Sequence, residues 1–218
     1  MGRTLTVKGI GKISVKPDYT VISISLKVLN KVYDDAMEKA GMQIEALREA
    51  LCAIGFEKQD LKTTGFNVHS RYNNERDKNG NYKNVFAGFE CIHQLKLEFD
   101  FDMKKLALVL SALSTSSTEP EISVKFIVKS KSAVCEELLR NAVGSAAQKA
   151  KLLALASGVT LGDIVSIDYN WDELDFISPT RYEASNDCFA LKASARSIDI
   201  EPDDINVSDS VTIIWEIK

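Results

Sequence analysis

The sequence predicts an α+β fold in which long helices pack on mainly antiparallel sheets. Residues 19–28 alternate apolar and polar side chains, which is typical of a strand with one buried face. From Tyr33 to Ile54 the apolar residues recur at steps of four and three, which indicates a helix with one apolar stripe. The polar stretch 73–81, rich in turn formers, separates two strand-like runs and therefore indicates a long hairpin.

The other elements follow from the same patterns. Asn30 is expected to cap the first helix, and Gly55 to end it in a left-handed conformation. Two more helices are predicted over about 103–113 and about 133–156. The second of these is rich in alanine, so that it can approach its neighbours closely at Ala142, Ala146, Ala147 and Ala150. Strands are predicted over residues 5–8, 19–28, 61–71, 85–99, 122–128, 164–171, 190–200 and 211–217.

Composition excludes several classes of protein. The chain has 218 residues and a net charge of −4, so it lacks the overall positive charge that holds nucleic acid. Its longest apolar run, 106–113, is too short for a membrane span, and the residues after Met1 lack an export leader, so the cytoplasm is expected. Without a CxxC pair, the cysteines are expected to be buried and reduced: Cys52, Cys91, Cys135 and Cys188.

A weak internal repeat suggests duplication. A constant shift of 103 residues places Pro17 on Pro120 and Gly55 on Gly158 without a gap. The order strand, long helix, strand, loop, strand also recurs, although coincidence between two similar stretches is the alternative. We therefore expect a single domain built of two βαββ repeats, about 1–101 and about 102–218.

No motif predicts a catalytic, metal or cofactor site. Gly9-x-Gly11 lacks the rest of a phosphate-binding loop and is interpreted as a strand turn. His69 and His93 lie on adjacent predicted strands, but Cys91 and Glu90 fall on opposite faces, so a metal is not expected.

One long loop is the candidate interaction site. Residues 172–183 combine carboxylates with aromatic side chains that look exposed, and long ordered loops often carry function. The alternatives are a solvated loop, a partner or subunit contact, and an acid–base site. The candidate interaction residues are Asp172, Glu173, Phe176, Arg181 and Tyr182.

Several motifs together resemble the SIMPL domain family, which includes the bacterial 26 kDa periplasmic immunogenic proteins. The opening 9–18 (GIGKISVKPD) resembles the start of that family, and 60–68 (DLKTTGFNV) resembles its strand after the first helix. The Ala-rich helix with the turn 158–162 (GVTLG), and the closing stretch 202–213, complete a resemblance over essentially the whole chain.

The resemblance implies an α+β fold and no common enzymatic activity. Bacterial members of this family are mostly exported to the periplasm or outer membrane, are linked to oxidative-stress defence and can form ring-like oligomers. A kinase-associated signalling adaptor is the eukaryotic namesake. This chain differs in lacking an export signal, which argues against a role in the envelope.

Three functional hypotheses follow. The first is a non-enzymatic protein that forms homo-oligomers through sheet edges and the loop around Phe176 and Tyr182, where a charge would weaken assembly without unfolding the monomer. The second is a small-ligand-binding or hydrolytic protein that uses a cleft between the repeats near Asp172, Glu173 and Asp175. The third, thiol-based stress sensing, requires an exposed low-pKa cysteine and is disfavoured by the apolar surroundings of all four.

Overall fold

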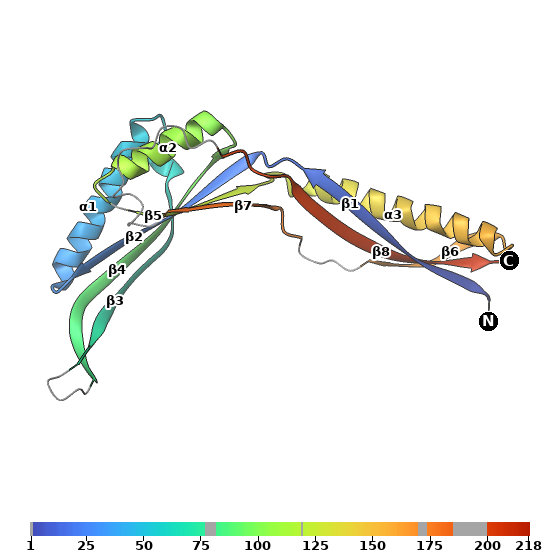
Figure 1. The fold of residues 1–218 in the computed structure, drawn as a ribbon, viewed down its shortest axis with the longest axis horizontal. Helices are drawn as coiled ribbons and strands as arrows, with labels where there is room; N and C mark the ends of the chain where they lie inside the picture. The colour runs from blue at the N-terminus through green and yellow to red at the C-terminus, as the bar shows by residue number, and fades with distance from the viewer. Residues whose placement is uncertain (1, 77–81, 119, 170–173, 185–199) are drawn as a thin grey trace. The chain divides into compact units, whose positions relative to one another are not determined.

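The computed structural model describes residues 2–76, 82–118, 120–169, 174–184 and 200–218. These residues form helices and antiparallel sheets, so the predicted α+β class is confirmed. The elements are β1 (Thr4–Val15), β2 (Tyr19–Asn30), α1 (Tyr33–Cys52), β3 (Lys62–Arg76), β4 (Tyr82–Asp100), α2 (Met103–Thr115), β5 (Glu121–Ile127), α3 (Lys131–Ala156), β6 (Leu161–Tyr169), β7 (Ile177–Ala184) and β8 (Ile205–Ile217), with a single 3₁₀ turn at Lys58–Asp60 (Figure 1).

The chain divides into two units that interleave along the sequence. Unit 1 comprises Met1–Asp18, Ile127–Pro179 and Asp203–Lys218, and unit 2 comprises Tyr19–Phe126 and Thr180–Pro202. The units are therefore not the two halves of the chain. The second predicted repeat has its first strand, β5, in the sheet of unit 2, and its helix α3 in unit 1.

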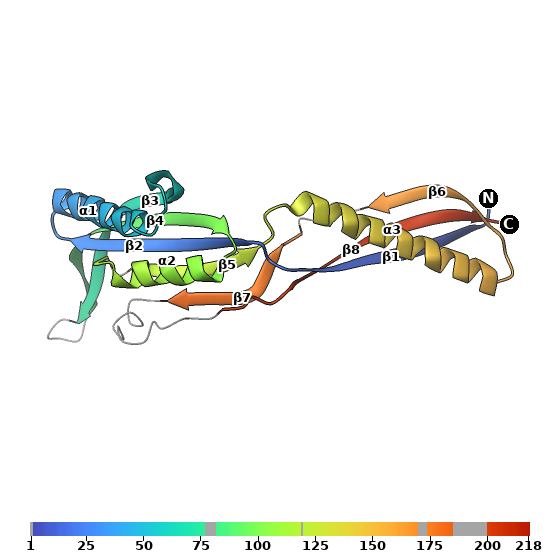
Figure 2. The ribbon, with the colours of Figure 1, turned by 90° about the horizontal axis from the view of Figure 1, so that it is seen from above.

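Unit 1 is a sheet of order β1-β8-β6 with α3 on one face. Both strand pairs are antiparallel, and α3 packs mainly on β1 and β8 (Figure 2). Its buried stripe is almost entirely alanine, as expected for a helix lying close to a sheet. One core cluster consists of Val7, Ala142, Ala146, Ala150, Val211, Ile213 and Trp215.

Gly9 and Gly11 set the separation between β1 and α3. A Cβ atom on Gly9 would lie 2.1 Å from the carbonyl oxygen of Ala142, and one on Gly11 would lie 2.2 Å from that of Leu138. Only a residue without a side chain fits at these positions. The Gly-x-Gly motif therefore lies inside a strand, and its interpretation as a turn was wrong, because the glycines serve helix packing and do not reverse the chain.

Unit 2 is a sheet of order β3-β4-β2-β5-β7 with α1 and α2 on the same face. The helix-facing side chains of β2, β4 and β5 alternate with polar ones, and they join the apolar stripes of both helices in one core cluster. Leu47 of α1, Val109 of α2 and Leu97 of β4 are fully buried there. The opposite face of this sheet carries no described helix.

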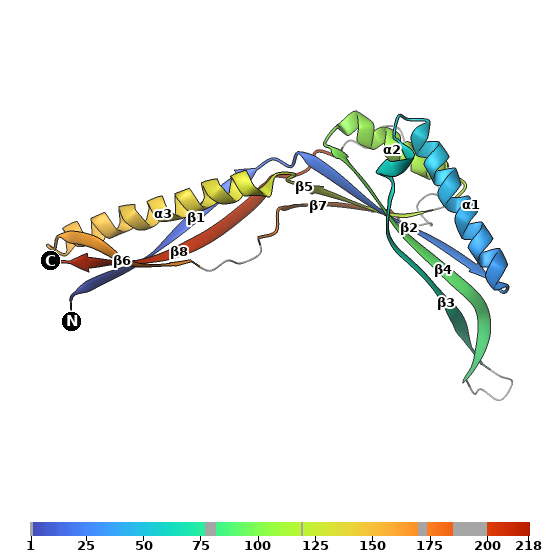
Figure 3. The ribbon, with the colours of Figure 1, turned by 180° about the vertical axis from the view of Figure 1, so that it is seen from behind.

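The β3–β4 hairpin is longer than predicted and continues past the start of α1 (Figure 3). We call the residues Ser70–Arg76 and Tyr82–Phe89 the arm; every β3 residue within it is exposed. A register shift after Arg71 and the positive φ of Gly88, +148°, mark a bulge where the arm leaves the body of the sheet.

The ends of α1 confirm one prediction and correct another. Gly55 has φ of +96°, so a left-handed residue follows the helix as expected. Asn30 does not cap it, because the helix begins later and Val32 is the N-cap residue; the Asn30 side chain instead accepts a hydrogen bond from the Val32 N–H at 3.2 Å. No helix among the described residues is long and apolar enough to cross a membrane.

Replacing Gly9 by valine should destabilise unit 1, because the side chain would displace the α3 backbone. Overpacking of this kind costs about 1–3 kcal/mol or more, measured as a lower urea midpoint. Gly144→Ala is the matched control: nothing lies within 4 Å of that helical position, so the substitution should raise stability by up to about 1 kcal/mol. Equal midpoints for Gly9→Val and the wild type would contradict the close approach.

Candidate functional site

The outer edge of β6 is an exposed apolar strand edge. β6 pairs with β8 on one side, and no described strand lies beside its other edge. Ile164, Val165 and Ile167 are 52%, 54% and 57% exposed. Three of the four residues 164–167 are thus exposed β-branched residues, although side chains of this kind are usually buried.

The packing of α3 explains this exposure. Ile164 pairs with Trp215 and Ile167 pairs with Ile213, so both lie on the helix-facing side of the sheet. The helix covers β1 and β8 but scarcely reaches β6, because it is held close over the glycines of β1. The third strand of the sheet therefore presents its apolar side chains without a cover from the described residues.

β3 and β6, two of the four outer strands of the two sheets, differ in their charges. β3 carries positive charges at Lys62, Arg71 and Arg76, which discourage strand addition. β6 has no lysine, arginine or proline, and its only charges are Asp163 and Asp168. Both strands have two register shifts, so it is the absence of positive charge that makes β6 the better of these two for accepting another strand.

The predicted interaction loop is not a single loop. Asp172 and Glu173 lie outside the described residues, and Asp175 is exposed. Phe176 is only 1% exposed: it packs with Val128, Leu138, Ile205 and Val207 of unit 1, and its carbonyl accepts a hydrogen bond from the Val128 N–H at 3.3 Å. The expectation that Phe176 is exposed was therefore wrong, because a polar neighbourhood in sequence does not reveal a partner from a distant strand.

Arg181 and Tyr182 belong to the strand β7. Arg181 is exposed, whereas Tyr182 is partly buried against the core of unit 2. Alternation along β7 thus sends neighbouring side chains to opposite faces. A charge at Phe176 would enter the core, so that substitution cannot test assembly; the role of Arg181 and Tyr182 in contacts remains a prediction.

The helix-free face of the unit 2 sheet has a shallow groove of about 700 Å³. The side chains that line it include Ser23, Ser25, Thr64, Gln94, Glu121 and Glu183. Glu121 is engaged by Lys27, with 2.6 Å between Oε1 and Nζ. Neither histidine lines this groove, and a hydroxyl beside a histidine base is the usual arrangement for nucleophilic catalysis.

The two histidines lie on opposite faces of their sheet. His69 is opposite Glu90 across the strands, with 3.2 Å between Nε2 and the carboxylate, and Arg71 also pairs with Glu90. His93 lies on the other face, 2.9 Å from the Thr63 hydroxyl and edge-on to Phe66. Within the described ranges, no three His, Cys, Asp or Glu side chains are grouped to hold a metal ion.

The described cysteines are free thiols in different surroundings. Burial raises the pKa of Cys91, which makes it a poor nucleophile. Cys135 is partly buried, and Cys52 is exposed at the end of α1, so the expectation of a buried thiol was wrong there: the helix stripe leaves that position on the solvent side. Cys188 lies outside the described residues.

Comparison with known proteins decides the family. The model of SIMPL, a protein of unknown function (DUF541), matches residues 5–215. The chain belongs to the SIMPL family. The 26 kDa periplasmic immunogenic proteins of Brucella melitensis and Brucella abortus are each 26% identical to it over 216 residues, which cover 98% of this chain and 84% of the relative. The predicted resemblance is confirmed, and in this SIMPL protein Gly9 and Gly11 make the close contact between β1 and α3.

Phe176→Asp should unfold unit 1 and not merely disperse an assembly. Removing the ring alone, as in Phe176→Ala, should cost roughly 3–5 kcal/mol because it leaves a cavity among buried side chains. Urea unfolding of both variants measures this loss. Arg181→Ala is the control, since an exposed change of this kind stays within about 0.5 kcal/mol; a fully stable Phe176→Asp would show that the ring is not in the core.

His93 should lower the stability of the folded protein in mild acid. Burial, followed by the positive charge of Arg48, lowers its pKa in the folded protein below the ordinary value near 6.5. The unfolded chain therefore binds the proton more readily, and this part of the stability is present above pH 6.5 and declines as the pH falls through that value. Urea midpoints at pH 7.5 and 5.5 should differ more for the wild type and for His69→Gln than for His93→Gln; equal differences in all three proteins would refute the assignment.

Proposed function

We propose that this SIMPL protein is a non-enzymatic protein that self-assembles into homo-oligomers, and that copies meet through the outer edge of β6. The observation that carries the proposal is the exposure of Ile164, Val165 and Ile167 on a strand that lacks lysine and arginine. Unpaired backbone groups beside exposed apolar side chains favour the addition of another strand.

A second copy of β6 is a suitable partner strand. In an antiparallel pair centred on Val165, Asp163 lies opposite Ile167 of the other copy, and Asp168 lies opposite Gly162. No like charges then face each other, and the same edge is used by both copies, as a two-fold interface requires. The two three-stranded sheets would become one sheet of six strands.

Stress-related roles implied by the family resemblance would be exerted through this assembly. The relatives' names place the Brucella proteins in the periplasm. The cytoplasmic location of this chain stays a prediction, which fractionation of cells expressing the natural gene would check.

Val165→Lys should reduce the oligomer, because in this register it places two positive charges directly opposite each other at the centre of the pair. The Val165 side chain is already more than half exposed, so the monomer should keep its urea midpoint. Light scattering over a concentration series measures the mass. The wild type should give a discrete oligomer, and Val165→Lys a smaller species at equal concentration.

Leu152→Lys is the matched control. Leu152 is 66% exposed and belongs to α3, away from the strand edge, so this substitution should leave the mass unchanged. A wild-type monomer at every concentration would contradict self-assembly. An oligomer that survives Val165→Lys would exclude the β6 edge as the contact.

A further inference from the structure

One face of the arm of unit 2 carries a row of aromatic rings that begins at Tyr33 of α1. Ring centroids lie 5.6 Å apart for Tyr33 and Phe89, 5.4 Å for Phe89 and Phe86, and 5.7 Å for Phe86 and Tyr72. Tyr82 lies farther along the same face, beyond the pair Asn74 and Asn84, and the Arg76 guanidinium covers its ring at 5.1 Å. We call these five rings the aromatic strip.

The bulge at the base of the arm creates this strip. Phe86 and Phe89 are three residues apart and would point to opposite faces of a regular strand. The register shift between Arg71 and Tyr72 pairs Tyr72 with Phe86 and Arg71 with Gly88, so one residue is added and both phenylalanines reach the same face. At Gly88 a Cβ atom would lie 2.6 Å from the Asn30 carbonyl oxygen, so glycine is required there.

The strip is exposed although it continues from the core of unit 2. Phe89 packs with the cluster around Ala36 and Cys91, whereas Tyr72 is 59% and Tyr82 is 69% exposed. A two-stranded ribbon by itself is marginally stable in water, and this one has no described element on either face beyond the start of α1. Tyrosine and arginine in such a strip are the residues enriched at protein interfaces.

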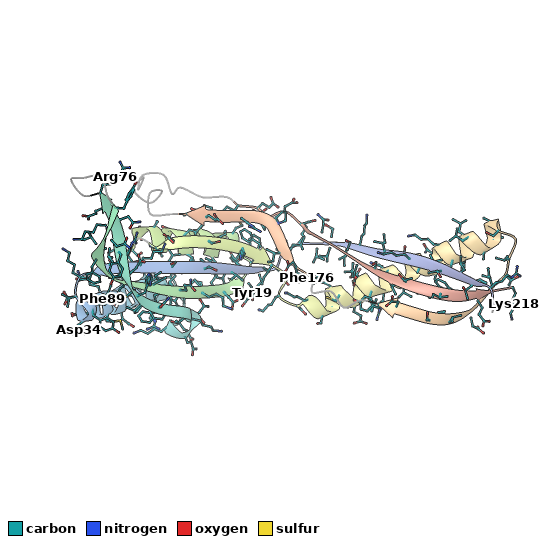
Figure 4. All side chains as sticks on the ribbon, turned by 90° about the horizontal axis from the view of Figure 1, so that it is seen from below. Tyr19, Asp34, Arg76, Phe89, Phe176 and Lys218 are labelled. Carbon is teal, nitrogen blue, oxygen red and sulfur yellow. The ribbon has the colours of Figure 1, made fainter. Side chains whose placement is uncertain are left out.

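The charges at the two ends of the strip are opposite. Arg76 lies at the far end, and Asp34 lies beside Phe89 at the start of α1 (Figure 4). Asp35 is in the same first turn of the helix. At this end of the strip, by the base of the arm, there are more exposed carboxylates than lysines: the charged residues are Lys31, Asp34, Asp35, Glu38 and Lys39.

We propose that the aromatic strip binds the same strip of a second copy, with the two arms antiparallel, so that Arg76 of each copy meets Asp34 and Asp35 of the other. Antiparallel placement is the arrangement that matches positive with negative ends and uses one surface twice, as a two-fold contact requires. The partner is a second copy, so this inference deepens the proposed self-assembly, but its surface is separate from β6. Two different two-fold contacts on one chain build rings or filaments larger than a dimer.

Charge reversal tests the pairing. Arg76→Glu should reduce the oligomer to the dimer held by β6, because like charges then meet at both ends of the strip. Tyr72→Lys should do the same by charging the middle of it. Adding Asp34→Lys and Asp35→Lys to Arg76→Glu should restore the wild-type mass in light scattering, whereas Asp34→Asn with Asp35→Asn should not.

The neutral double variant is the control for the helix itself. Asp34 and Asp35 also stabilise the N-terminus of α1, and both double variants remove that effect. Recovery of mass only with the lysines therefore supports contact with Arg76 of the other copy. Lack of recovery would overturn the proposed pairing, as would wild-type mass for both Arg76→Glu and Tyr72→Lys.

The two contacts can fail separately. If both exist, Val165→Lys leaves a dimer held by the arms, and Val165→Lys with Arg76→Glu leaves a monomer. An unchanged mass for Arg76→Glu together with a monomeric Val165→Lys would overturn the arm contact and leave the β6 contact standing. The reverse result would support the arms and exclude the β6 edge.

Discussion

The close approach of α3 to β1 is the constraint on which unit 1 depends. The carbonyl oxygens of Ala142 and Leu138 occupy the space where side chains of Gly9 and Gly11 would lie. A single helix can bury the inner face of only about two strands at this distance, since neighbouring strands are spaced by about 4.8 Å. The third strand, β6, therefore keeps its apolar side chains exposed. The surface proposed for assembly is thus a direct consequence of how the core is packed.

In unit 2 the helices cover more of the sheet than in unit 1. Two helices cover the body of a five-stranded sheet, and their leucines and valines form a larger core than the alanines of unit 1. The β3–β4 hairpin continues past the start of α1, so no described helix covers the arm. In each unit, the exposed apolar side chains lie on the part of the sheet that the described helices do not cover. That part is β6 in unit 1 and the arm in unit 2.

Most of the elements could be predicted because they depend on local patterns. The helix from Tyr33, the long hairpin and the Ala-rich helix produce periods of 3.6 or 2 that need no tertiary information. β7 was predicted as a loop, because Pro179 and the acidic residues before it are turn-like in sequence. β7 is a strand because it pairs with its neighbour β5, and sequence periodicity does not show which distant segment will lie beside it. The predicted strand 190–200 lies outside the described residues.

The α+β class, the family and the periods of the helices and strands follow from the amino-acid sequence, since each depends on residue types at fixed spacing. Which surfaces remain uncovered depends on how distant segments pack. Ile167 and Phe176 illustrate the difference: the first is apolar within a clear strand pattern and is exposed, while the second follows a polar loop and is buried. Burial depends on which distant segment packs above a residue: for Ile167 the close approach of α3 to two glycines of β1 leaves the strand uncovered, and Phe176 packs with Val128, Leu138, Ile205 and Val207.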